Sequence, residues 1–275
     1  MEGQGIFCPE FYLQFRPFYP ASTFIGLEQS LRDQGFTPPF QVADLGCGTG
    51  HSTVSLLQAG LPVHVTGIDP DPAMVAAAQK LVQEFTDPAH TQWKIGSAEN
   101  IPLAAESIDA IIVGSAFHWM NAQRSASEFD RVLKPQGILR LFEYQFPKAL
   151  THPSLNEWIK KQFNEKWRAP GQIPRGSFKK ITEIFRGNSP WILRAEKQPQ
   201  MILRLTPEQL IGLILSQSRV YHYEKTLTAD EQRSFRLDLQ NEILREMSQT
   251  PELEFDFKLH WVEFQKSRKS SDDSS

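Results

Sequence analysis

The sequence predicts an α/β fold with a doubly wound, mostly parallel sheet, followed by a mainly helical segment. Three observations favour this fold. Between residues 40 and 145, apolar runs alternate with helical patterns, which is typical of βαβ units. The first run leads into three glycines at alternate positions, in the stretch VADLGCGTG at residues 42–50. After residue 150 the chain changes to helical patterns with scattered prolines and many aromatic residues.

Five strands are expected in the alternating segment. IDAIIVGSA at 108–116 has the strongest pattern for a buried strand, because it carries no charge after Asp109. The other four strands are predicted at QVADLG (41–46), VHVTGID (63–69), TQWKIG (91–96) and GILRLFEYQ (137–145).

Local start and stop signals bound the helices between these strands. Asp71 as N-cap and Pro72 at the first position begin a helix over 71–85. Gly60 ends the helix that follows the glycines. A further helix runs from about residue 122 to 133 and stops at KPQG, which contains a proline and a glycine.

The second half of the chain is expected to be mainly helical. Amphipathic helices are predicted at 154–167 and 177–187, and another helix is predicted at 228–248. A further helix is predicted over 206–218, where Thr206 as the cap and Pro207 at the first position begin it. Residues 192–205 are expected to be extended. ELEFDFKLHWVEFQ at 252–265 alternates apolar and polar residues, which predicts a late antiparallel strand.

The composition is that of a globular protein without strong charge bias. The 29 basic and 32 acidic residues give a net charge of −3, so no general attraction for nucleic acid or anionic membranes is expected. Cys8 and Cys47 cannot form a disulfide framework, which fits a reducing cytosol. The N-terminus lacks a secretory pattern, and the most apolar run, at 210–215, is too short to cross a bilayer. We therefore expect a cytoplasmic protein with no nucleic-acid or membrane partner and no metal site, while its oligomeric state stays open.

The glycine turn has a physical use. Glycines at 46, 48 and 50 permit a tight turn and let a ligand approach backbone N–H groups at a helix N-terminus, which suits a nucleotide-like ligand. His51 stands where a dinucleotide fingerprint would place its third glycine. That departure disfavours a nicotinamide-dependent oxidoreductase.

Five motifs in order resemble those of the class I S-adenosylmethionine-dependent methyltransferases. They are VADLGCGTG at 42–50, GIDP at 67–70, GSAENIPL at 96–103, ESIDAIIVGSAFHW at 106–119 and RVLKPQGIL at 131–139. The resemblance is nearest to the small-molecule subgroup that includes trans-aconitate methyltransferases. FYLQFRPFYP at 11–20 is similar to the N-terminal arm of that subgroup. The resemblance implies a Rossmann-like, seven-stranded sheet with a helical lid, and S-adenosyl-L-methionine as cofactor.

The resemblance, together with the sequence pattern of the late strand and the tail, predicts a division of the chain into segments with different roles. They are a cofactor-covering arm at 1–39, the cofactor-binding core at 40–150, a helical lid and substrate region at 151–250, a final sheet strand at 251–265 and a disordered tail at 266–275.

The resemblance implies a set of cofactor-binding residues. Three glycines, Gly46, Gly48 and Gly50, would surround the methionine part, and Asp44 would support its ammonium group. Asp69 would accept hydrogen bonds from both ribose hydroxyls.

The same resemblance places four further residues around the cofactor. Ala98 and Glu99 would lie by the adenine edge, and Ser115 would border the sulfonium. Ser97 stands where the subgroup usually has an acidic residue, although its hydroxyl can still bond the adenine amine.

Some of these residues have simpler explanations. Asp69 precedes Pro70 and could be a turn residue, and Asp44 could serve only to satisfy backbone donors near the helix. Glu99 could be a solvated loop acid.

Methyl transfer is an in-line displacement, so positioning in a dry pocket can supply much of the catalysis. His118, directly after the fourth strand, is the candidate general base for a protonated nucleophile, and the alternative is a packing histidine beside Trp119. SAFHW at 115–119 replaces the Asn/Asp-Pro-Pro-aromatic sequence of nitrogen methyltransferases, which favours oxygen, carbon or sulfur nucleophiles. We expect a small-molecule acceptor, with an oxygen of a carboxylate or hydroxyl as nucleophile.

Five residues are candidates for substrate contact. Arg16 or Arg219 could clamp a substrate carboxylate, although either could instead form a surface salt bridge. The full set is Tyr12, Arg16, Trp119, Arg219 and Tyr221. Two other classes stay open, namely an inactive S-adenosylmethionine-binding protein and a nicotinamide-dependent oxidoreductase.

Overall fold

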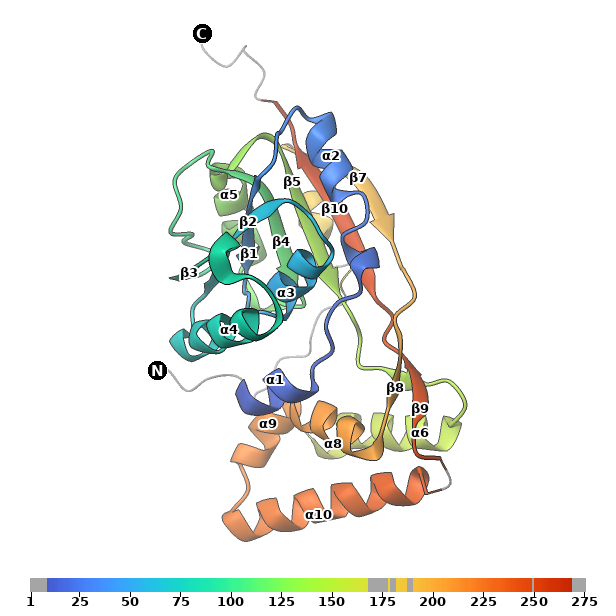
Figure 1. Ribbon diagram of the computed structural model, residues 1–275. Helices are drawn as coiled ribbons and strands as arrows, with labels where there is room; N and C mark the ends of the chain where they lie inside the picture. The colour runs from blue at the N-terminus through green and yellow to red at the C-terminus, as the bar shows by residue number, and fades with distance from the viewer. Residues whose placement is uncertain (1–8, 168–177, 179–181, 187–189, 249, 269–275) are drawn as a thin grey trace. The chain divides into compact units, whose positions relative to one another are not determined.

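The computed structural model describes residues 9–167, 178, 182–186, 190–248 and 250–268 (Figure 1). The chain divides into two compact units. Unit 1 consists of the described residues of Met1–Pro17, Gln145–Pro174 and Gln200–Lys258, and unit 2 of those of Phe18–Tyr144, Arg175–Pro199 and Leu259–Ser275.

Unit 2 contains a seven-stranded sheet with the order β3-β2-β1-β4-β5-β10-β7. The first five strands in the chain are parallel, and β10 is antiparallel to both β5 and β7. The strands are β1 (Phe40–Leu45), β2 (Val63–Asp69), β3 (Thr91–Ile95), β4 (Ile108–Gly114), β5 (Leu133–Glu143), β7 (Trp191–Lys197) and β10 (His260–Lys266). The prediction of a seven-stranded, mostly parallel sheet is confirmed.

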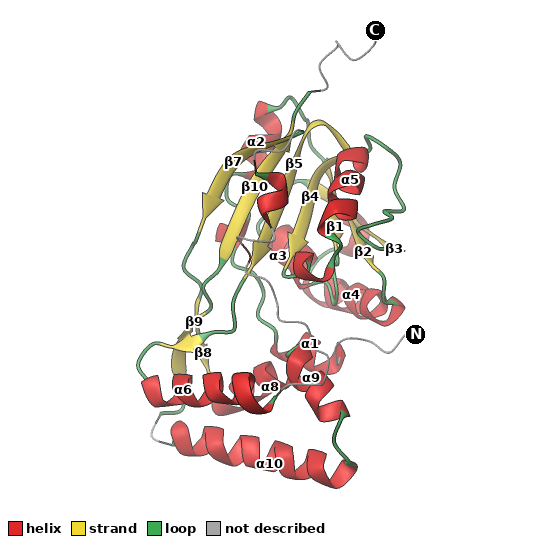
Figure 2. Ribbon diagram, turned by 180° about the vertical axis from the view of Figure 1, so that it is seen from behind, coloured by secondary structure: helices red, strands yellow, loops and turns green. Residues whose placement is uncertain are grey.

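Helices cover both faces of this sheet. Figures 1 and 2 show α2 and α3 on one face and α5 on the other, so the sheet is doubly wound. The helices of unit 2 are η1 (Ala21–Thr23), α2 (Leu27–Asp33), α3 (His51–Gln58), α4 (Pro72–Phe85), η2 (Pro88–His90), η3 (Phe117–Trp119), α5 (Ala122–Val132) and η5 (Glu183–Phe185).

The predicted helix ends in unit 2 are confirmed where local chemistry sets them. The Asp71 side chain accepts a hydrogen bond from the Ala73 N–H at 2.8 Å, and Pro72 is the first residue of α4. Gly60 follows α3 with φ of +77°. Strand β5, however, begins at Leu133 and not at residue 137, because Leu133 pairs with Ile108 before the register shifts.

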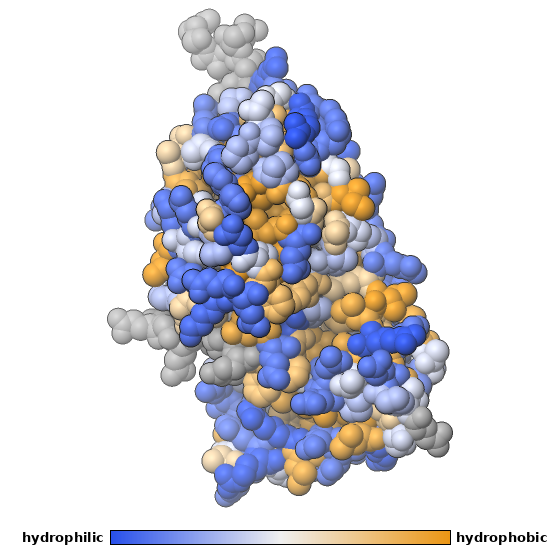
Figure 3. Space-filling view, in the orientation of Figure 1, coloured by the Kyte–Doolittle hydropathy of each residue, from blue (hydrophilic) through white to orange (hydrophobic). Residues whose placement is uncertain are grey.

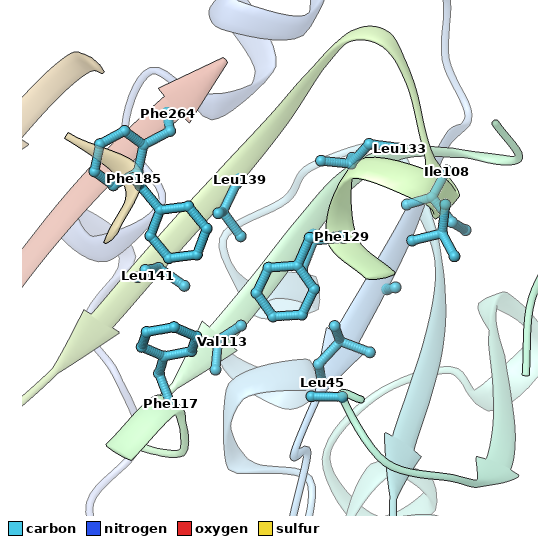
Figure 4. Close-up of a cluster of buried hydrophobic side chains, with 14 of the residues drawn as sticks. Leu45, Ile108, Val113, Phe117, Phe129, Leu133, Leu139, Leu141, Phe185 and Phe264 are labelled. Atoms are coloured by element: carbon cyan, nitrogen blue, oxygen red, sulfur yellow. The ribbon is translucent and has the colours of Figure 1, made fainter. Parts of the chain in front are cut away.

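An aromatic cluster fixes α5 and the turn after β4 to the sheet. Figure 4 shows the rings of Phe117, Phe129 and Phe185 gathered against aliphatic side chains of β4 and β5. The centroid of Phe185 lies 5.4 Å from that of Phe117 and 6.2 Å from that of Phe129. Burying a side chain of this size contributes about 1.5–3 kcal/mol. Phe117 therefore anchors η3, the turn that also carries His118.

A buried ion pair ties the start of unit 2 to its sheet. Arg140 of β5 donates to Glu263 of β10, and both side chains are almost fully buried. The remaining Arg140 nitrogen donates to the carbonyl oxygens of Thr23 and Ile25, each at 3.1 Å. Glu263 also accepts from the Ser30 hydroxyl at 2.8 Å. A buried pair survives only with such additional hydrogen bonds, and here they hold the residues around η1 and α2 in place.

Unit 1 combines helices with a three-stranded antiparallel sheet of order β6-β9-β8. Thr206 and Thr228 begin helices with capping boxes, which involve Gln209 and Glu231 respectively. The elements are α1 (Pro9–Phe15), β6 (Lys148–Ala149), α6 (Pro153–Lys161), the π-helical turn η4 (Gln162–Lys166), β8 (Ile202–Leu205), α8 (Pro207–Leu215), α9 (Ser218–Lys225), α10 (Ala229–Glu246) and β9 (Leu253–Asp256).

The structure differs from the expected segmentation in three places. The single strand expected over 252–265 is two strands, because Lys258 has φ of +49° and β9 and β10 enter different sheets. The expected lid at 151–250 is divided, since β7 belongs to unit 2. The expected helix over 206–218 is interrupted, because α8 ends at Leu215 and α9 starts at Ser218.

Two expectations fall partly or wholly outside the described residues. Of the helix expected over 177–187, the structure describes residue 178 and residues 182–186, which include η5. Of the tail expected to be disordered at 266–275, residues 269–275 lie outside the described part. Lys266 is not in a disordered tail, because it is buried as the last residue of β10.

Polar side chains predominate on the face of the molecule seen in Figure 3, with apolar side chains in smaller groups between them. Among the residues that the structure describes, no helix is both long enough and apolar enough to span a bilayer.

Candidate active site

The glycine turn between β1 and α3 contains three left-handed residues. Gly46, Gly48 and Gly50 have φ values of +64°, +53° and +87°. A Cβ on Gly46 would lie 2.7 Å from the Cβ of Ala116, and one on Gly50 would lie 3.0 Å from the Cβ of Ala78. At Gly48 an added Cβ would meet no atom within 4 Å. The outer two glycines therefore serve close packing, whereas Gly48 leaves open space against the backbone where a ligand can lie.

Asp44 is a fully buried carboxylate at the end of β1. Its Oδ2 accepts hydrogen bonds from the hydroxyls of Ser52 and Thr53, each at 2.6 Å. Its Oδ1 is buried and has no hydrogen-bond partner among the described residues. Burial raises the pKa of Asp44 to about 6, although the bonds from Ser52 and Thr53 act in the opposite direction. A buried carboxylate oxygen without a partner is a place for a cationic hydrogen-bond donor.

Asp69 ends β2 and reaches the glycine turn. Its Oδ2 accepts from the Gly48 N–H at 2.9 Å, and its Oδ1 accepts from the Asp71 N–H at 3.0 Å. Burial raises the pKa of Asp69, and these backbone hydrogen bonds lower it. Because each carboxylate oxygen has two acceptor sites, Asp69 retains one on each oxygen for a pair of ligand hydroxyls.

The loop after β3 carries Ser97, Ala98 and Glu99. Ala98 is buried, and the Glu99 carboxylate accepts from the Asn121 N–H at 2.7 Å. Burial raises the pKa of Glu99, but hydrogen bonds from Asn121 and Ser97 outweigh it and lower the pKa. Glu99 is thus ionised and held against the start of α5.

A second contact from α5 holds the same loop. Glu128 accepts a hydrogen bond from the Ile101 N–H at 2.8 Å. Arg131 pairs with Glu128 and donates to the carbonyl oxygens of Ile101 and Leu103, each at 2.9 Å. The loop geometry is therefore fixed by two charged side chains of α5.

Ser115 lies just after β4 in a conformation that is rare for a residue with a side chain, with φ of +51°. Its N–H donates to the Phe142 carbonyl at 2.7 Å. Its hydroxyl accepts a 2.9 Å hydrogen bond from the Tyr19 hydroxyl. Since strained residues concentrate at functional sites, this conformation fits the expected role of Ser115.

Sequence reasoning missed Tyr19. Its backbone N–H donates to the Ser55 hydroxyl at 2.9 Å, and its ring packs edge-on against Phe142 with centroids 4.7 Å apart. The preceding Phe18 stacks on His51, with centroids 4.8 Å apart. The signal for Tyr19 in the sequence is its place in the stretch FYLQFRPFYP, in which the resemblance points to Tyr12 and Arg16.

His118 follows β4 within η3, and its side chain is only 3% exposed. Its Nδ1 lies 3.9 Å from the Oε2 of Glu143 at the end of β5. Trp119 beside it is 48% exposed, and the two ring centroids are 4.9 Å apart. An imidazole next to a carboxylate at this edge of the sheet has the arrangement of an oriented base, and it is equally a well-packed histidine.

Four of the five expected substrate residues belong to unit 1, and Trp119 belongs to unit 2. Within unit 1, the Arg16 guanidinium lies 4.8 Å from the centroid of the Tyr12 ring and donates to the Ser216 carbonyl at 3.1 Å. The Tyr221 ring has the Lys225 ammonium 5.3 Å from its centroid.

Arg219 lines a cavity of about 360 Å³ in unit 1. It donates to the Phe163 carbonyl at 3.0 Å. Lys148 and Lys160 line the same cavity, which also has the apolar side chains of Phe146 and Phe163 in its wall. Glu157 also lines the cavity and pairs with Lys160 at 3.5 Å, so the lining carries three cations and one carboxylate. A partly apolar cavity with net positive charge suits an organic anion.

The core of the chain matches a known family. A family model described as a methyltransferase domain matches residues 43–141. An uncharacterized methyltransferase of Mycobacterium tuberculosis is 30% identical over 178 residues, which are 65% of this chain and 64% of the relative. The chain therefore spans less than two thirds of the length of that relative.

The chain is also similar, over a longer alignment, to an uncharacterized methyltransferase-like protein of Schizosaccharomyces pombe. The two are 30% identical over 211 residues, 76% of this chain and 75% of the relative. A solved structure described as a type II methyltransferase of Anaeromyxobacter dehalogenans shares the fold, with a TM-score of 0.63 and 20% identity over 92% of this chain and 98% of that chain. Together with the geometry of the glycine turn, these similarities show that the chain belongs to the class I S-adenosylmethionine-dependent methyltransferase family.

Proposed function

We propose that this protein transfers a methyl group from S-adenosylmethionine to an oxygen atom of a small molecule. One observation carries the cofactor assignment. The buried Oδ1 of Asp44 has no partner within the described residues, and open space lies against the nearby Gly48 backbone. A ligand with an ammonium group and a thin, extended backbone would satisfy both features.

The residues of unit 2 fit the rest of the cofactor. Asp44 would accept from the ammonium group, and Asp69 would accept from the two ribose hydroxyls. Ser97, Ala98 and Glu99 would border the adenine, and Ser115 would border the sulfur. The cofactor supplies an electrophilic methyl group on a positively charged sulfur when it is bound.

The protein would contribute positioning and, for some acceptors, a proton acceptor. A hydroxyl acceptor must lose a proton, and we assign this proton to the Nε2 of His118, because Nδ1 lies on the side of Glu143. A carboxylate acceptor needs no base, because it is already ionised at neutral pH. The resemblance of the motifs to those of the trans-aconitate subgroup supports an acidic acceptor of small size.

The proposal is tested in two steps. Calorimetry with S-adenosylhomocysteine should show binding, and NAD should not bind. Turnover of S-adenosylmethionine is then measured with a panel of aliphatic acids, aromatic acids and phenols. Absence of S-adenosylhomocysteine binding would overturn the proposal, and binding without turnover of any acceptor would favour an inactive binding protein.

The variant His118→Gln separates the two acceptor types. With a hydroxyl acceptor, loss of a general base should lower kcat by about 10²–10⁴-fold. With a carboxylate acceptor, the same variant should keep kcat within a few-fold of the original value. An equal loss for both types would remove the role of proton acceptor from His118.

A further inference from the structure

Unit 1 contains a second cavity, which the proposed methyl transfer does not use. It has a volume of about 610 Å³ and lies between the segment of α6 and η4 and the helices α9 and α10. Figures 1 and 2 show α6 and α10 side by side. We refer to it as the α6–α10 groove. Its volume is in the range of binding sites for small organic molecules.

Four aromatic side chains line the groove: Trp158, Trp167, Tyr223 and Phe235. Trp167 packs edge-on against Trp158 and Phe235, with interplanar angles of 81° and 80°. Tyr223 meets Phe235 at 79°. Because neighbouring rings are nearly perpendicular, their faces point in different directions around the groove. Ring faces carry negative potential and attract organic cations.

A buried amide also lines the groove. Gln162, the first residue of η4, is 8% exposed. Within the described part of the chain, its side chain forms no hydrogen bond, whereas its main-chain carbonyl accepts from the Trp167 N–H at 2.9 Å. Because no described group bonds this amide, its oxygen is available to a ligand in the groove that can donate to it.

The charge of the groove is negative. Three carboxylates, Glu231, Asp238 and Glu242, line it together with one ammonium, that of Lys166. Hydrogen bonds from the Thr228 hydroxyl and N–H lower the pKa of Glu231, so this residue is ionised at neutral pH.

Of the other two carboxylates, one is paired with a cation and one is not. Glu242 is paired with Arg245. Asp238 forms no ion pair with any residue that the structure describes, so its charge is available to a ligand.

We infer that the α6–α10 groove binds a small organic cation, namely a protonated primary amine attached to an apolar body. The ammonium would donate to the Gln162 side chain and be attracted by Asp238, while the apolar body would pack against Trp167 and Phe235. All of these residues belong to unit 1. Binding in the groove therefore does not depend on the proposed methyl transfer.

The test uses the whole chain, with and without S-adenosylhomocysteine, because this ligand blocks the Asp44 carboxylate, the other proposed site for a cationic group. Phenethylammonium is titrated by calorimetry, with 3-phenylpropanol as the neutral analogue and 3-phenylpropanoate as the anionic one. Phenethylammonium should bind and quench tryptophan fluorescence, because Trp158 and Trp167 line the groove. Absence of phenethylammonium binding at millimolar concentration, or equal binding of the three probes, would overturn the inference.

Two variants locate the binding. Gln162→Leu removes a hydrogen bond to a charged group and should weaken phenethylammonium binding about tenfold or more. Asp238→Asn removes an exposed charge and should weaken it about two- to fivefold. Glu208→Gln removes a charge from an exposed position of α8 outside the groove and should leave the affinity unchanged. Circular dichroism verifies folding, and unaltered affinity in both groove variants would contradict the assignment.

Discussion

The Asp69 carboxylate accepts a 2.9 Å hydrogen bond from the Gly48 N–H, so one side chain at the end of β2 fixes the glycine turn that follows β1. In the proposed complex the same carboxylate accepts from the ribose hydroxyls. The shape of the turn and the position of the ribose are thus set by one group.

Replacement of Asp69 should therefore weaken cofactor binding. Asp69→Ala is expected to lower the affinity for S-adenosylhomocysteine by about 1.5–3 kcal/mol, the usual range for hydrogen bonds to a charged group. Calorimetry measures the change. Asp87→Ala is the control, because Asp87 also accepts an N–H at a helix start, from Ala89 at 2.9 Å, without any expected part in the site. Equal affinities for Asp69→Ala and the original protein would show that the ribose lies elsewhere.

Gly48 offers a test of the open space at the turn. Gly48→Ala should destabilise the fold by about 1–2 kcal/mol, because the residue has a left-handed conformation. Its Cβ would also occupy the space assigned to the cofactor, so S-adenosylhomocysteine should bind about 5- to 160-fold more weakly, as expected for about 1–3 kcal/mol of overpacking.

Gly60→Ala is the matched control for that variant. Gly60 has φ of +77° and likewise has no atom within 4 Å of an added Cβ, but it lies after α3. The two variants should lose similar stability in urea unfolding, and only Gly48→Ala should lose affinity. Parallel losses of affinity in both would argue against a ligand at Gly48.

Asp44 should make stability depend on pH. Burial raises its pKa from 3.8 to about 6, so the folded protein holds this proton more tightly than the unfolded chain. Stability should therefore fall by about 3 kcal/mol as the pH rises from 3.8 to about 6. Urea unfolding of Asp44→Asn across this range should lack the decrease. The variant should gain stability relative to the original protein as the pH rises, and a constant difference would contradict the assignment.

The same group should make cofactor binding depend on pH. An ionised Asp44 attracts the cofactor ammonium, so the affinity for S-adenosylhomocysteine should increase as the pH rises towards and past about 6. In Asp44→Asn the affinity should be lower and its dependence on pH in this range should disappear. Calorimetry at several pH values measures both effects, and a variant that keeps the same slope would exclude Asp44 as the titrating group.

The hydrogen bond between Tyr19 and Ser115 should couple the N-terminal segment of unit 2 to the site. Tyr19→Phe and Ser115→Ala each remove it and should each weaken S-adenosylhomocysteine binding by about 0.5–1.5 kcal/mol. The double variant should lose little more than either single one, because both changes delete the same interaction. Fully additive losses would show that the two hydroxyls act separately.

The core elements were predictable because their signals are local. Asp71 caps α4 through the Ala73 N–H only two residues away, and Thr206 caps α8 through the Gln209 N–H three residues away. The strands between 40 and 145 were recognisable as apolar runs, and the glycine turn was recognisable by its spacing. The motif residues Asp44 and Asp69 were found for this reason.

The late segment shows the limit of such signals. Alternation over 252–265 indicates which residues share a face of a strand, but it does not specify the partner strand. The left-handed Lys258 separates β9, which pairs with β6 and β8, from β10, which pairs with β5 and β7. The separation of β9 from β10 depends on these partner strands, and the alternation of apolar and polar residues does not indicate where it occurs.

The sequence by itself determined the α/β core, the glycine turn and the acidic residues at the ends of β1 and β2, because short-range periodicity and caps encode them. Only the tertiary structure decided which distant groups meet. Tyr19 reaches Ser115 across 96 positions, Arg140 pairs with Glu263 across 123, and Gln162 is buried in a groove formed with α9 and α10. These contacts follow from sheet order and helix packing, which depend on the burial of the whole chain and not on any local pattern.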